Sequence, residues 1–207
     1  MRPRSLLVLI VVLAVIAPSV YARGKKPAPT APGTYKEWGQ DIDQIEIIKT
    51  FRIQDYDKII VQPFDTTKAP LPDKKEKWYG TMKSALAAYT EWFMEGLQPE
   101  LKAKADVEQL SSAPKTSKTL IIRGVVDSMD PGSRAGRYWG GFGAGAASSK
   151  ATVEIVDAKS GKVLAIVTQA RRAAGTFKGA GGSDLEVMRD SVHAMAKDIA
   201  HVLDTFV

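Results

Sequence analysis

The chain has 207 residues, a formal net charge of +6 at pH 7, no cysteine and two histidines. The absence of cysteine excludes disulfide bonds, so the fold must be stabilised by the burial of apolar side chains. The length is sufficient for one ordinary hydrophobic core. The modest basic charge does not by itself identify a class of partner.

Residues 1–22, MRPRSLLVLIVVLAVIAPSVYA, have the features of a secretory signal peptide. Arg2 and Arg4 supply a positive start, and an unbroken apolar run of 11 residues occupies positions 6–16. A membrane-spanning helix needs about 20 residues, so we expect the segment to be cleaved after Ala22. We therefore expect a periplasmic or secreted protein with no transmembrane segment after cleavage.

Residues 23–40 are predicted to form a basic, proline-rich linker. Pro27, Pro29 and Pro32 alternate with alanine and threonine, a composition that is typical of an extended chain and builds no core. A single folded domain is expected to follow over residues 41–207.

The first half of that domain predicts two strands and a helix. Residues 45–53, IEIIKTFRI, favour a strand, and the β-branched run at 59–61 before Pro63 indicates a buried strand. After a polar loop over residues 65–77, apolar side chains recur at helical spacing from Trp78 to Leu97. The residues on that face are Met82, Leu86, Tyr89, Phe93 and Leu97.

The second half predicts three more strands and a final helix. Strands are expected over 119–129, with a bulge at Gly124, and over 151–156 and 163–168, which a short DAKSGK turn connects. Ser183 and Glu186 have the spacing of a helix capping box. The core stripe that follows is Leu185, Met188, Val192, Met195, Ile199 and Val202. This order predicts an α+β fold, with a mostly antiparallel sheet of four to five strands and two helices packed on one face.

The glycine-rich stretch GGFGAGAA between two of these strands resembles a loose phosphate-binding loop. A dinucleotide site needs a helix after such a loop, whereas residues 151–156 predict a strand, and the lysine of a Walker motif is missing. Three interpretations stay open for this stretch. It is a flexible connection, a membrane-contacting loop that uses Tyr138 and Trp139 with small residues around them, or an anion-binding loop.

The charge distribution favours the anion-binding interpretation. Residues 131–183 hold eight basic and two acidic residues, a net charge of +6, whereas the whole chain from Arg23 carries +4. Arginine guanidinium groups and glycine-rich backbone are both suited to phosphate and carboxylate groups. The candidate binding residues, in two glycine-rich loops, are Arg134, Arg137, Tyr138, Trp139, Gly141, Gly143, Gly145, Arg171, Arg172 and Lys178.

The sequence offers little to catalysis. His193 and His201 are predicted on the outer face of the last helix with Lys197 between them, and a cation there opposes a metal site. There is no cysteine and no G-x-S-x-G motif for a nucleophile. We expect no catalytic residue, no metal and no cofactor, and export disfavours nucleic acid as a partner.

Several segments resemble a bacterial exported family known only as domain-of-unknown-function family 4410. They are LIIRGVVDSMDPG, RYWGGFGAGAA, VEIVDAKSGKVL, the GAGG turn and the alanine-rich last helix, together with the strand DYDKIIVQPF. The resemblance implies an exported domain and no assigned activity. Some members are lipoproteins, but this chain has no cysteine to carry a lipid.

These observations lead to one expectation about function and two alternatives. We expect a non-enzymatic cell-envelope protein of uncharacterised role that binds a partner protein, an anionic lipid or a cell-wall polymer through its basic glycine-rich loops. The alternatives are a structural subunit of an oligomeric envelope assembly and an envelope hydrolase.

Overall fold

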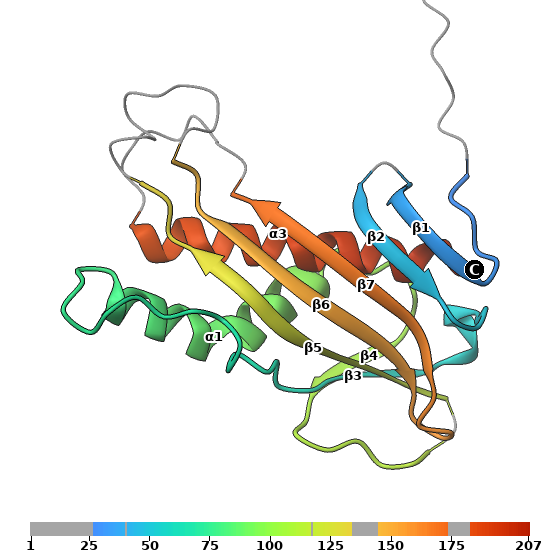
Figure 1. The fold of residues 1–207 in the computed structure, drawn as a ribbon. Helices are drawn as coiled ribbons and strands as arrows, with labels where there is room; N and C mark the ends of the chain where they lie inside the picture. The colour runs from blue at the N-terminus through green and yellow to red at the C-terminus, as the bar shows by residue number, and fades with distance from the viewer. Residues whose placement is uncertain (1–26, 40, 117, 134–144, 174–182) are drawn as a thin grey trace, which may run out of the picture.

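The computed structural model describes residues 27–39, 41–116, 118–133, 145–173 and 183–207. These residues form one seven-stranded sheet with two long helices on the same side of it (Figure 1). The strands are β1 (Gly33–Trp38), β2 (Ile42–Ile47), β3 (Lys58–Val61), β4 (Asp106–Gln109), β5 (Thr119–Asp130), β6 (Ser148–Asp157) and β7 (Val163–Arg172). The helices are α1 (Tyr79–Leu97) and α3 (Asp184–Thr205), with one 3-10 turn, η1 (Ile53–Asp55).

The strand order across the sheet is β1-β2-β7-β6-β5-β3-β4. β3 pairs in parallel with both β4 and β5, and the other four neighbouring pairs are antiparallel. The prediction of a mostly antiparallel sheet of four to five strands was therefore wrong, although the α+β class and the two helices on one face hold. β4 has no clear strand pattern in the sequence, because it has only four residues and none of its side chains is buried.

The first strand begins inside the range predicted as linker. β1 occupies residues 33–38, and Trp38 at its end is only 2% exposed. The proline-rich residues before it contact the domain, because the Trp38 indole N–H donates to the Pro29 carbonyl at 2.7 Å and the Tyr35 hydroxyl donates to the Ala31 carbonyl at 3.1 Å. Proline removes a backbone donor but leaves its carbonyl free to accept such bonds.

The two helices lie at the positions that the sequence predicts. The five apolar residues that define the predicted face of α1 are all buried, and α3 begins with the predicted capping box between Ser183 and Glu186. Along the predicted stripe of α3 only Leu185 is exposed, because it lies in the first turn, at the edge of the core. Neither helix in the described part of the chain combines the length and apolar character that crossing a membrane requires.

α1 and α3 approach each other closely at Gly96. A Cβ atom at this position would lie 2.8 Å from the Cα and 3.0 Å from the carbonyl oxygen of His193 on α3. Because backbone atoms cannot move aside as a flexible side chain can, only glycine fits this crossing.

Gly124 in β5 has a similar role, and it is not the bulge that the sequence predicts. A Cβ there would collide with the Phe64 ring, which covers this part of the strand. The irregularity in the pairing of β5 with β6 lies further along, between Val126 and Ser128.

The C-terminal aromatic residue connects both ends of the described chain. The Phe206 ring stacks on Phe51 at a centroid distance of 4.4 Å and on Trp38 at 6.3 Å. The Phe206 carbonyl also accepts a hydrogen bond from the Ile53 N–H at 2.7 Å. The end of α3 is therefore fixed to the first strands of the sheet.

Candidate functional site

Both predicted glycine-rich loops leave the sheet at the same end. Asp130 at the end of β5 pairs with Ser148 at the start of β6, and Ser148 pairs with Arg172 at the end of β7. The chain between β5 and β6 and the chain between β7 and α3 therefore start from three adjacent strands (Figure 1). We call this the loop end of the sheet, defined by Asp130, Ser148 and Arg172.

The N-terminal segment also enters the fold near the loop end. β2 runs antiparallel to β7, so the turn between β1 and β2 lies at the same end of the sheet as Arg172. A Cβ built on Gly39 in this turn would lie 3.6 Å from the Ala28 side chain. Three basic residues, Arg23, Lys25 and Lys26, directly precede the described residues. The sequence thus adds positive charge to the chain that enters at this end.

β7 extends further than the sequence predicts and includes both Arg171 and Arg172. Successive side chains of a strand point to opposite faces of a sheet, so these two adjacent arginines have different surroundings. The Arg171 side chain lies on the helix-covered face, whereas Arg172 is exposed. The sequence alone placed both in one loop and assigned them one role.

Arg171 is the centre of a polar cluster below β7. Its guanidinium forms a bidentate ion pair with the Asp198 carboxylate of α3. Nη2 donates to Oδ1 at 2.8 Å, and Nε donates to Oδ2. Nη2 also donates to the Asp41 backbone carbonyl at 2.7 Å. The fully buried Gln169 amide donates to Asp198 Oδ2 at 2.7 Å and to the Asp41 carbonyl at 2.9 Å. The cluster connects α3, β7 and the β1–β2 turn.

The electrostatics of the cluster keep Arg171 in this arrangement. The hydrogen bonds to Asp198 raise the pKa of the Arg171 guanidinium, and partial burial opposes that effect. A charged side chain that is removed from water in this way is costly to separate from its partner. Arg171 is therefore part of the scaffold that supports the loop end.

Arg172 and Lys150 have the opposite character. Both side chains are exposed, and neither forms an ion pair or a side-chain hydrogen bond with any other residue of the described ranges. Arg172 is the last residue of β7, and Lys150 lies two residues beyond Ser148 on β6. These two cations are available to a ligand at or beside the loop end.

The described residues that flank the first glycine-rich loop form a compact base. The Ser133 N–H donates to the Gly145 carbonyl at 2.9 Å, and the Asp130 carboxylate accepts the Gly132 N–H at 2.7 Å. Gly132 and Gly145 have φ angles of +70° and +72°, values that glycine adopts without the strain of a side chain. The base holds the two ends of the loop side by side.

Seven of the ten predicted site residues lie outside the described residues. They are Arg134, Arg137, Tyr138, Trp139, Gly141, Gly143 and Lys178. Of the other three, Gly145 and Arg172 lie at the loop end, and Arg171 lies beneath it in the cluster with Asp198.

Two carboxylates elsewhere, Asp127 and Glu95, form local structural pairs. Asp127 accepts from the Thr152 hydroxyl at 3.0 Å. Glu95 of α1 binds Arg189 at 2.7 Å and His193 at 3.2 Å, and these two partners lower the pKa of its carboxyl group against the opposing effect of burial. Within the described ranges, no group of three or more acidic or histidine side chains is placed to hold a metal ion.

A signal for the cluster was present in the sequence. Asp198 lies between Met195 and Ile199, which both belong to the predicted core stripe of α3. An acidic side chain next to a core stripe requires a partner. Identifying Arg171 as that partner requires knowing that β7 continues past Gln169.

The chain belongs to the family described as a domain of unknown function, DUF4410, whose model matches residues 50–176. This match confirms the resemblance that the sequence motifs indicated. No curated protein matches the chain.

Solved structures with a similar arrangement are distant in sequence. A PelC dodecamer from Paraburkholderia phytofirmans that carries one leucine-to-methionine substitution is 16% identical, with a TM-score of 0.43, covering 78% of this chain and 96% of that one. A PelC dodecamer from the same organism in another space group is 14% identical, with a TM-score of 0.42, covering 72% and 96%. Protein XCC0632 from Xanthomonas campestris, of family DUF330, is 11% identical, with a TM-score of 0.41, covering 76% and 91%.

Proposed function

We propose that this protein is an exported, non-enzymatic cell-envelope protein that binds an anionic surface through the loop end of its sheet. The observation that supports the proposal most strongly is the convergence of three basic segments on one end of the fold. These are the two glycine-rich loops, which start from β5, β6 and β7, and the N-terminal segment, which enters beside Gly39.

The chemistry of these segments fits an anionic surface. Arg134, Arg137 and Lys178 belong to the two loops in the sequence, and Arg172 is exposed where β7 ends. A basic residue close to an anionic lipid surface contributes about 1 kcal/mol to binding, and salt screens this attraction. Several weak contacts from one end of a rigid sheet add up to useful affinity without a deep pocket.

The alternatives predict different behaviour. A structural subunit of an oligomeric assembly would associate with itself, and its concentration-dependent mass would show this without any added surface. A hydrolase would need an acidic group in a cleft at the loop end. Asp130 lies there, but its side chain is exposed and accepts the Gly132 N–H at 2.7 Å. Asp157 lies at the other end of β6, and a hydrogen bond from Ser160 lowers its pKa.

The test is co-sedimentation of the chain from Arg23 with three matrices: vesicles that contain phosphatidylglycerol, vesicles of phosphatidylcholine alone, and purified peptidoglycan. We expect pelleting with an anionic matrix and none with neutral vesicles. The triple variant Arg134→Ser, Arg137→Ser, Arg172→Ser should bind about 100-fold more weakly, because it loses about 3 kcal/mol of surface attraction.

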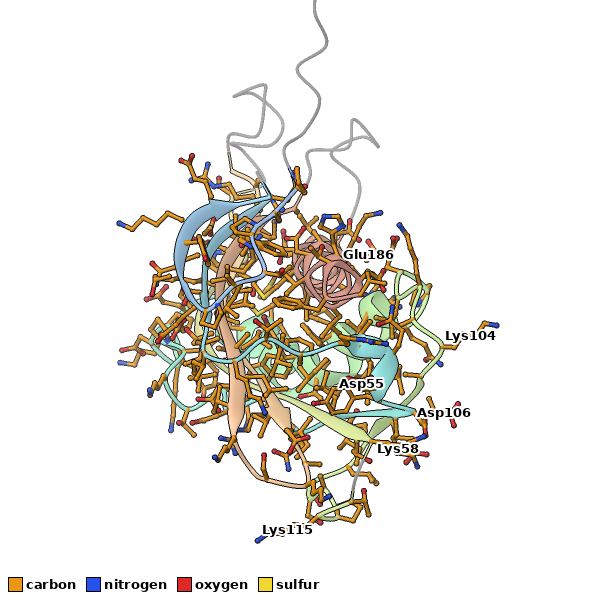
Figure 2. All side chains as sticks on the ribbon, turned by 90° about the vertical axis from the view of Figure 1, so that its right-hand side faces the viewer. Asp55, Lys58, Lys104, Asp106, Lys115 and Glu186 are labelled. Carbon is orange, nitrogen blue, oxygen red and sulfur yellow. The ribbon has the colours of Figure 1, made fainter. Side chains whose placement is uncertain are left out.

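A matched control removes the same charge elsewhere. The triple variant Lys104→Ser, Lys115→Ser, Lys159→Ser changes exposed lysines that form no ion pair within the described ranges. Figure 2 labels Lys104 and Lys115 away from Glu186, which lies in the first turn of α3 after the second glycine-rich loop. Equal loss of binding in both triple variants would contradict a role for the loop end.

A further inference from the structure

A pocket lies at the opposite end of the sheet from the loop end. It has a volume of about 290 Å³ and is formed by the segment that follows β2, by Tyr56 after η1, and by the turn between β6 and β7. Asp55, which Figure 2 labels, is one of the residues that line it. None of the candidate residues at the loop end lines this pocket.

Two lysines and two carboxylates line the pocket: Lys49, Lys162, Asp55 and Asp157. Lys49 and Lys162 both line it, and both side chains are exposed. Neither ammonium group forms an ion pair or a hydrogen bond with another residue of the described ranges. Lys49 is close enough to Asp157 to lower the pKa of that carboxyl group without bonding to it. Each ammonium group can donate up to three hydrogen bonds to a carboxylate or phosphate.

Asp157 supplies an acceptor beside the two cations. Its Oδ1 accepts the Ser160 N–H at 2.7 Å and the Ser160 hydroxyl at 2.5 Å, and its Oδ2 accepts the Tyr56 hydroxyl at 3.3 Å. The Ser160 hydrogen bond, against some desolvation, lowers the pKa of Asp157 and keeps it ionised. A carboxylate has about four acceptor positions, so one remains for a hydroxyl group of a ligand.

The pocket lining also includes Phe51, Tyr56 and Leu164, of which Phe51 and Leu164 are almost fully buried. The rings of Phe51 and Tyr56 meet edge to face at a centroid distance of 6.4 Å, and Leu164 lies beside them in the lining. Tyr56 is fixed by its bond to Asp157, and burial together with that carboxylate raises the pKa of Tyr56 to about 12. The hydroxyl therefore stays a donor at neutral pH. Tyr56 is the partly exposed aromatic residue of the lining, and its fixed ring suits contact with the C–H face of a sugar ring.

We propose that this pocket binds a single acidic sugar, a hydroxylated ring that carries a carboxylate or a phosphate. The ammonium groups of Lys49 and Lys162 hold the anionic group. The carboxylates of Asp157 and Asp55 accept ring hydroxyls, and the Tyr56 ring contacts the sugar ring. A volume of about 290 Å³ lies at the small end of the range for ligand pockets, which favours one ring over an oligosaccharide. This site goes beyond the proposed function and does not depend on it.

The test is to titrate the chain from Arg23 with each of four probes and to monitor its backbone amide signals by NMR. The probes are glucuronate, glucose 6-phosphate, glucose and inorganic phosphate. We expect saturable shifts at Ser160, Gly161 and Lys162 with at least one acidic sugar. Glucose should bind at least about tenfold more weakly, because it lacks the group that the lysines hold. Whichever acidic sugar binds more tightly identifies the preferred anionic group.

The variants separate a sugar site from a general effect of charge. The double variant Lys49→Ser, Lys162→Ser should weaken binding about tenfold. The chemical shifts of amides away from the pocket should match those of the unchanged chain, which shows that the fold is intact. The control, Lys104→Ser with Lys115→Ser, should bind as the unchanged chain does. Equal affinity for phosphate and for the acidic sugars would reduce the pocket to an adventitious anion site and overturn the proposal. No saturable shift with any probe, or unchanged binding by the Lys49 and Lys162 variant, would also overturn it.

Discussion

Replacing the two adjacent arginines of β7 one at a time should change the stability of the fold by very different amounts. Arg171→Ser removes three hydrogen bonds, two to Asp198 and one to the Asp41 carbonyl. The Asp198 side chain is only 12% exposed and would retain the Gln169 amide as its remaining partner in the cluster. Breaking a fully buried ion pair costs about 3–5 kcal/mol. Because the Arg171 side chain is 32% exposed, water relieves part of this cost, and we expect a loss of about 2–3 kcal/mol.

Arg172→Ser provides the matched comparison, since the same substitution falls one residue away on an exposed side chain. We expect it to change the free energy of unfolding by less than about 0.5 kcal/mol. The measurement is urea unfolding monitored by tryptophan fluorescence, and linear extrapolation to zero urea then yields the free energy of unfolding in water. Equal stabilities of the two variants would refute the assignment of Arg171 to the scaffold. If Arg171→Ser loses stability because it leaves the Asp198 carboxylate without its cationic partner, then replacing both residues should be less harmful. The double variant Arg171→Met, Asp198→Leu should therefore be less destabilising than Arg171→Ser alone.

Two further predictions concern the helix crossing and Tyr56. Gly96→Ala should destabilise the fold by about 1–3 kcal/mol, because its Cβ would collide with the backbone of His193. Gly80→Ala on the same helix has open space and should stabilise by about 0.5–1 kcal/mol, both measured by urea unfolding. Tyr56 should ionise near pH 12 in the folded protein, as the ultraviolet difference between the chain and its Tyr56→Phe variant will report. Burial and the Asp157 carboxylate raise this pKa, so the corresponding stability is present below pH 10 and is lost as the pH rises toward 12. The pKa shift of Tyr56 should shrink in Asp157→Asn, and an unchanged titration there would contradict the contribution of Asp157.

The sequence predicts those parts of the fold in which local pattern and burial agree. The apolar stripes of α1 and α3 located both helices, and the capping box located the start of α3. The buried run in β3 and the long strand β5 were also visible as apolar segments. These signals depend on side chains within one element, which is why a single sequence carries them.

The sheet order and the edge strands carry no such signal. β1 follows three prolines, and β4 has four residues with no buried side chain, so neither resembles an isolated strand. The chain leaves β3 through α1 and returns as β4 on one side of β3, and it then continues to β5, which lies parallel to β3 on the other side. That pairing joins residues about sixty positions apart, and local periodicity contains no information about it.

The candidate site was predicted in part for a similar reason. The concentration of positive charge over residues 131–183 is a property of the sequence, and it directed attention to the two glycine-rich loops. The distinction between Arg171 and Arg172 depends on the continued strand alternation at the end of β7 and on Asp198 from a distant helix. The pocket around Asp157 combines segments from residues 49 to 164 and has no linear motif.

The central claim is that the loop end binds an anionic surface, and the salt dependence of vesicle binding tests it most directly. The chain from Arg23 would be mixed with phosphatidylglycerol-containing vesicles across a series of salt concentrations, and the bound fraction would be measured after sedimentation. The account predicts binding at low salt that falls steeply as screening shortens the reach of the basic residues at the loop end. Absence of binding at low salt, or binding that salt leaves unchanged, would contradict it.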